Sequence, residues 1–141
     1  MIVVDVNVLL AAFRQDHAQH ELARPWLEQM LSGGDEVVVP DAVWIGFVRI
    51  ATNQAIFEVP ATAAEAFEFV TSVTGSAGYR VMPGLVDGLA LFARVCLESQ
   101  AVGNLIPDAY IASVARAYAC PVASFDRDFR RFDDLEIVVP A

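Results

Sequence analysis

Aspartates at well-separated positions are the residues of this chain best suited to chemistry. Asp5 follows the apolar run Ile2-Val3-Val4, Asp108 opens an alanine-rich segment after Pro107, and Asp126 and Asp128 follow the apolar run 121–125. Carboxylates that gather at one place repel each other unless a cation lies between them. Oxygen ligands of this kind suit Mg²⁺ or Mn²⁺, which activate water and stabilise charge on a phosphoryl group. The aspartates therefore predict a metal-assisted hydrolytic site.

Two neutral side chains have spacings that would support such a site. Asn7 lies two residues after Asp5, and Ser124 lies two residues before Asp126, so each can point to the same side as its aspartate. A hydroxyl placed there can orient a ligand or a water. Asn7 and Ser124 are therefore supporting candidates.

Each acid also has a purely structural interpretation. Asp5 could cap the helix that follows it, Asp126 could cap the last short helix, Asp108 could be a first-turn acid, and Asp128 could be solvated. Arg49, the one charged residue of the apolar segment 42–51, could contact a substrate phosphate or simply pair with an acid. The sequence leaves these alternatives open.

Short apolar runs alternate with helical patterns along the whole chain. Strands are predicted at residues 2–4, 36–39, 79–82, 121–125 and 135–139, and helices at residues 7–14, 17–31, 42–52 after an Asp41 cap, 61–73, 85–99, 107–119 and 129–132. This alternation predicts an α/β fold, with a mainly parallel sheet between helices on both faces. The length of 141 residues fits one domain, residues 1–141. The carboxyl ends of parallel strands share one edge, where the acids would meet.

The charge balance excludes several functions. The net charge is −9, and all nine basic residues are arginine, with no lysine. A Walker A phosphate loop and Schiff-base chemistry both need a lysine. The acidity also argues against general coating of nucleic acid, which uses basic patches. It does not exclude an enzyme that holds a divalent cation and touches phosphates locally.

The high apolar content has no membrane explanation in the sequence. Hydrophobic residues make up 56% of the chain, yet no run approaches the roughly 20 residues of a membrane span. The first residues lack the basic region of a signal peptide, so we expect a cytoplasmic protein without membrane contact. The segment 42–51 is apolar almost all round, which predicts burial on more than one side and favours a homodimer.

Four ordered motifs resemble those of PIN-domain ribonucleases, in particular the VapC-type toxins of bacterial toxin–antitoxin pairs. The motifs are Asp5-Val-Asn-Val-Leu, Gly46-Phe-Val-Arg49-Ile-Ala-Thr52, Pro107-Asp108-Ala-Tyr-Ile-Ala112 and Ser124-Phe-Asp126-Arg-Asp128-Phe129. No single motif is specific, but the ordered set covers essentially the whole chain. The resemblance implies an endoribonuclease that uses Mg²⁺, or Mn²⁺, to cleave structured or translation-related RNA.

The resemblance also assigns roles and partners. Asp5 and Asp108 match the family's metal-binding acids, and Asp126 matches the acid that supports the metal or the attacking water. Asp128 is a weaker member of the set. The implied partners are an RNA substrate, a small antitoxin encoded alongside, and a second copy of the chain.

One position departs from the family pattern. Family members commonly carry a glutamate three residues before the arginine of the third helix, and here Gly46 takes that place. The departure supports an alternative, in which the chain is a non-catalytic PIN-like module that binds RNA or a partner. A phosphatase of the haloacid-dehalogenase type is a third hypothesis, but it would need an aspartate where Asn7 stands and a lysine.

Overall fold

The computed structural model describes residues 1–141, and its centre is a four-stranded parallel sheet. The strands are β1 (Ile2–Val4), β2 (Val37–Val38), β3 (Val122–Ala123) and β4 (Ile137–Val138), in the order β2-β1-β3-β4. In β1, Val3 pairs with Val38 on one side and with Val122 on the other. Because β1 is a central strand, the residue after it lies at the middle of the carboxyl edge.

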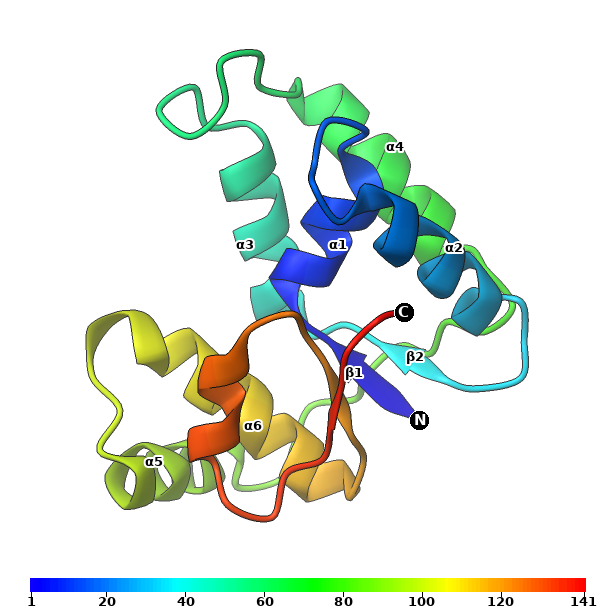
Figure 1. Ribbon diagram of the computed structural model, residues 1–141. Helices are drawn as coiled ribbons and strands as arrows, with labels where there is room; N and C mark the ends of the chain where they lie inside the picture. The colour runs from blue at the N-terminus through cyan, green and yellow to red at the C-terminus, as the bar shows by residue number, and fades with distance from the viewer.

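Helices cover both faces of this sheet, as the sequence predicts. They are α1 (Val6–Phe13), α2 (His20–Leu31), α3 (Asp41–Ala51), α4 (Ala63–Thr74), α5 (Gly88–Ser99), α6 (Ile106–Tyr118) and the 3₁₀ segments η1 (Gly103–Leu105) and η2 (Arg127–Arg131). Figure 1 shows α1 to α4 gathered on one side of the strands and α5 with α6 on the other. None of these helices has the length and apolar character that crossing a membrane requires.

The core explains why the central strand is continuously apolar. Val3 and Val4 are fully buried, and Ile2 is 4% exposed, because helices pack on both faces of β1. In α6, the side chains of Ala109, Ala112 and Ala115 are all fully buried. Small side chains at these positions let α6 lie close to the sheet, which carries the start of α6 toward the end of β1.

The predicted strand at residues 79–82 is wrong. Only one residue pair forms there, a parallel bridge between Tyr79 and Val37. The bridge is held by Val37 N donating to Gly78 O at 2.7 Å and Arg80 N donating to Val37 O at 2.9 Å. The chain then leaves the sheet edge, since Pro83 has no N–H to donate.

Several helix boundaries also differ from the prediction. The second helix begins at His20 rather than residue 17, because the His17 imidazole accepts a hydrogen bond from Gln19 N at 3.1 Å and holds a turn there. Asp41 is the first residue of α3 rather than its cap, a position taken by Pro40. The fourth predicted helix, residues 61–73, spans Ala63–Thr74, and the fifth, residues 85–99, begins later at Gly88 and ends at Ser99 as predicted.

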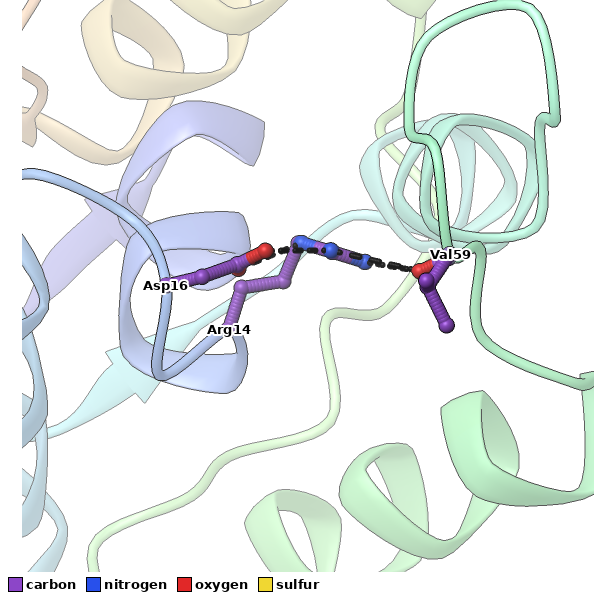
Figure 2. A network of polar contacts seen from close by, with 3 residues as sticks. All are labelled: Arg14, Asp16 and Val59. Atoms are coloured by element: carbon purple, nitrogen blue, oxygen red, sulfur yellow. Dashed lines mark hydrogen bonds and ion pairs between the residues drawn. The ribbon is translucent and has the colours of Figure 1, made fainter.

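A half-buried arginine, Arg14, joins two loops on the α1–α4 side. Arg14, at the end of α1, donates from Nε and Nη2 to the two carboxylate oxygens of Asp16, at 2.9 and 2.8 Å. Its Nη1 and Nη2 donate to Val59 O at 3.2 and 3.3 Å (Figure 2). The guanidinium carbon also lies 3.8 Å from the ring centre of Phe57. Arg14 therefore fixes the loop between α3 and α4 against the loop between α1 and α2.

Candidate active site

Asp5 lies at the carboxyl end of β1 and also caps α1, so the structural interpretation of this residue is confirmed and its part in a metal site stays a prediction. Its Oδ1 accepts a hydrogen bond from Val6 N at 2.7 Å, and the residue has the extended backbone of an N-cap. Its Oδ2 accepts a second bond from the Ser124 hydroxyl at 2.8 Å. The residue is only 2% exposed. The cap therefore holds a nearly buried carboxylate in a single orientation at the sheet edge.

Ser124 connects the ends of β1 and β3. Its buried hydroxyl accepts hydrogen bonds from Asn7 Nδ2 and from Asp126 N, both at 3.0 Å, and donates to Asp5. Asn7 also accepts a bond from Phe125 N at 3.2 Å through Oδ1. Two accepted bonds fill the lone pairs of the hydroxyl, so its proton is directed at Asp5. Asn7 and Ser124 thus both belong to the network around the aspartates.

Asp108 reaches the same edge from the first turn of α6. The residue is half-buried, and its carboxylate accepts no hydrogen bond from the protein. The pKa of Asp108 is raised from 3.8 to about 7, first by burial and then by the charges of Asp5, Asp126 and Asp128 in that order. Since those charges act on Asp108, the structure brings the four predicted acids into one electrostatic cluster.

The other acids differ in their surroundings. Burial raises the pKa of Asp5 to about 6, opposed by its bonds from Ser124 and Val6 and reinforced by the charge of Asp126. Asp126 caps η2, and its Oδ1 accepts a bond from Asp128 N at 2.8 Å. Asp128 is exposed, as its structural interpretation expected, although its charge still acts on Asp108.

The donor set fits a hard cation with an incomplete protein shell. No three acidic, histidine or cysteine side chains converge closely enough to enclose an ion by themselves. Mg²⁺ ordinarily takes one or two carboxylates and completes its octahedron with waters and substrate phosphates. None of the four ion pairs in the structure involves an acid of this cluster. Asp5 and Asp108 are the acids of the cluster whose pKa is raised, in both cases mainly by burial.

Gly46 and Arg49 lie on α3. A Cβ built on Gly46 would meet no heavy atom within 4 Å, so open space stands where the family pattern places a glutamate. Arg49 is exposed and forms no ion pair, which excludes its pairing with an acid in this structure. No contact joins Arg49 to the aspartates, and its part in phosphate binding stays a prediction.

Two arginines beside the cluster were not singled out from the sequence. Arg127 and Arg130 line a cavity of about 310 Å³ together with Ser124, Phe125 and Asp126. Their signal in the sequence was the density of arginine in residues 127–131, which hold three of the nine in the chain.

Comparison with known proteins agrees with this fold. Residues 2–135 match the model of the PIN domain family. The chain is 44% identical over 140 residues to ribonuclease VapC31 of Mycobacterium tuberculosis and 41% identical over 140 residues to ribonuclease VapC25 of the same organism, with 99% of each chain covered. A crystal structure of VapBC2 from Rickettsia felis, bound to a DNA fragment from its promoter, superposes with a TM-score of 0.71 at 14% identity, covering 100% of both chains.

These similarities define the class of protein. The chain belongs to the PIN-domain family, in its VapC branch. The predicted fold class and the predicted resemblance are both confirmed.

Proposed function

We propose that this chain is an Mg²⁺-dependent endoribonuclease that acts as the toxin of a toxin–antitoxin pair. The observation that carries the proposal is the convergence of Asp5, Asp108, Asp126 and Asp128 at one sheet edge, where none of them forms an ion pair with a basic side chain. The ribonuclease names of VapC31 and VapC25, full-length relatives of the chain, support RNA as the substrate. Mn²⁺ would occupy the same oxygen ligands.

The side chains have distinct parts in this proposal. Asp5 and Asp108 hold the ion, and Asp126 orients the attacking water in line with the phosphodiester. Ser124 holds Asp5 in place through its hydrogen bond, and Asn7 holds Ser124 by donating to the same hydroxyl. Asp128 adds negative charge at the rim, and Arg49 contacts a substrate phosphate. The bound ion would supply the activation of water and the stabilisation of charge on the phosphoryl group.

The partners follow from the same reasoning. The substrate class is structured or translation-related RNA, and a small antitoxin would cover the acidic edge. The pairing of toxin and antitoxin in the VapBC2 structure supports the second partner. A homodimer through α3 is supported by Ile45, which is 69% exposed in the single chain. An RNA substrate of this class implies a cytoplasmic location.

Metal titration with RNA cleavage on the same samples tests the proposal. Mn²⁺ and Mg²⁺ are titrated calorimetrically into the antitoxin-free protein and into Asp5→Asn and Asp108→Asn. Joint loss of metal binding and cleavage in both variants, with relief of growth arrest on expression, is the expected result. Wild-type protein that binds metal but cleaves no RNA would contradict the assigned reaction.

Gly46 supports a second candidate, a non-catalytic module that binds RNA or a partner. Gly46 itself offers no ligand, and a Cβ built there would meet no heavy atom within 4 Å. Such a module would show no ion binding that depends on Asp5 or Asp108. The same titration therefore distinguishes the two candidates.

A further inference from the structure

The arginines of this chain fall into two groups. Four pair with a carboxylate, namely Arg14 with Asp16, Arg24 with Glu28, Arg80 with Glu36 and Arg116 with Glu98. Five form no ion pair, and three of these lie within the five residues of η2: Arg127, Arg130 and Arg131. The chain has 18 acidic residues and nine arginines, so acidic partners outnumber the arginines two to one. The unpaired arginines of η2 therefore point to a negatively charged ligand from outside the chain.

The position of η2 is rigid and close to the acidic cluster. It begins directly after Asp126, whose carboxylate caps it. Phe129 is fully buried in the core and holds the segment from its middle. A 3₁₀ helix has three residues per turn, so Arg127 and Arg130 lie above one another on one face. Both side chains are exposed beside a fixed acid of the site.

Arg127 and Arg130 share a cavity with residues of the site. The cavity, about 310 Å³, is also lined by Gln19, Ser124, Phe125 and Asp126. Its size lies at the lower end of the roughly 300–1,000 Å³ that ligand pockets occupy. It thus runs from two guanidinium groups to the aspartate that would orient the attacking water. A ligand seated there would place one anionic group on the arginines and another beside the acids.

We propose that Arg127 and Arg130 bind the RNA phosphate adjacent to the scissile one, so that this cavity is a backbone subsite. The inference rests on the proposed function. A protein of net charge −9 repels a polyanion, and a pair of guanidiniums beside the reacting edge offsets that repulsion locally. Arginine suits the task because its planar fork donates two parallel bonds to a phosphate. The contact is made to the backbone, so it positions RNA without reading its sequence.

Equilibrium binding of RNA tests this subsite. All proteins carry Asp108→Asn, which keeps the RNA intact and disturbs no hydrogen bond of that carboxylate. The variants are Arg127→Gln, Arg130→Gln and the double variant that carries both substitutions. The probe is a short fluorescein-labelled single-stranded RNA, whose binding is measured by fluorescence anisotropy over a range of salt concentrations. Arg94→Gln is the matched control, because Arg94 is also exposed and unpaired but lines a different cavity, among Glu98, Asp133 and Asp134.

The expected result is a loss of affinity of about tenfold or more in the double variant. The slope of log affinity against log salt should also fall, by about 0.7 for each arginine removed. Arg94→Gln should leave the slope unchanged. Equal effects of Arg94→Gln and the η2 substitutions would overturn the inference, because they would reflect net charge alone.

Two further readouts separate the possible failures. Poly-L-glutamate is titrated in parallel as a model of an acidic protein segment. If the η2 substitutions weaken binding of poly-L-glutamate but not binding of RNA, the arginines receive an acidic protein segment and the inference fails. Cleavage of the same RNA by protein with an intact Asp108 tests the proposed function independently. Cleavage with unchanged RNA binding in the η2 variants would overturn the subsite alone, whereas absence of both cleavage and binding would overturn both proposals.

Discussion

The hydroxyl of Ser124 donates a 2.8 Å hydrogen bond to Oδ2 of Asp5, although the two residues are 119 positions apart in the chain. This bond joins the ends of the two central strands, β1 and β3. It also opposes the effect of burial on the pKa of Asp5. One buried hydroxyl thus serves both the packing of the sheet edge and the charge state of the acid.

Replacing Ser124 by alanine should lower the stability of the protein and raise the pKa of Asp5. Asn7 Nδ2 and Asp126 N, both partly buried, would each lose their acceptor, which should lower the free energy of unfolding by about 1 kcal/mol. The pKa of Asp5 would rise further, so Mn²⁺ affinity at neutral pH should fall. Urea unfolding and calorimetric titration measure the two effects. Unchanged metal affinity in a folded Ser124→Ala protein would contradict the positioning of Asp5 by this hydroxyl.

The metal-free protein should lose stability as pH rises. Asp5 and Asp108 have folded pKa values of about 6 and about 7, above the ordinary value of 3.8. Between pH 3.8 and about pH 7 the folded state holds more protons than the unfolded state. The free energy of unfolding therefore falls with increasing pH in this range. The loss should begin near pH 3.8 and be complete above about pH 7. Thermal melts in EDTA across this range measure it, and a flat profile would contradict the raised pKa values.

Asp108→Asn should remove much of that pH dependence. The carboxylate accepts no hydrogen bond from the protein, so the amide has no donor to conflict with and the repulsion from Asp5 disappears. At pH 8 in EDTA the variant should melt at a higher temperature than wild type. Addition of Mn²⁺ should raise the melting temperature of wild type only. A destabilised variant in EDTA would show that Asp108 has a structural part that the contacts do not reveal.

Gly46→Glu should restore an acid to α3. A Cβ at this position meets no heavy atom within 4 Å, so the side chain has room to enter. If α3 faces the ion as the family pattern implies, Mn²⁺ affinity should increase. Gly46→Ala is the matched control, expected to stabilise the helix by about 0.5–1 kcal/mol without changing metal affinity. Equal metal affinity in the two variants would mean that position 46 faces away from the ion.

Arg14→Lys should release the loop between α3 and α4. A lysine cannot reproduce the bidentate contact with Asp16 while also donating twice to Val59 O (Figure 2). We expect a loss of about 1 kcal/mol of stability and faster hydrogen exchange in residues 53–59. Arg24→Lys, in an exposed pair with Glu28 on α2, should change stability by less than about 0.5 kcal/mol. Equal exchange in both variants would contradict the role of Arg14.

Much of the fold was available from local patterns. The apolar β-branched run Ile2–Val4 predicts a strand buried on both faces, and the alternation of strands with helices predicts a parallel sheet. The shared edge of the acids then follows from topology, because parallel strands end on the same side. Local patterns failed at residues 79–82, where the number of pairing residues depends on the path that the chain takes past β2.

The sequence by itself thus determined the fold class, the acids and the edge where they meet. Only the tertiary structure decided how those acids are held. It shows that Asp5 caps α1 while lying nearly buried at the sheet edge, that Ser124 donates to it, and that the Asp108 carboxylate accepts no hydrogen bond from the protein. The physical reason is that residue type and spacing determine strand direction and helix faces locally. Hydrogen bonds and pKa shifts depend on distances between segments more than 100 residues apart, which are set only when the core packs.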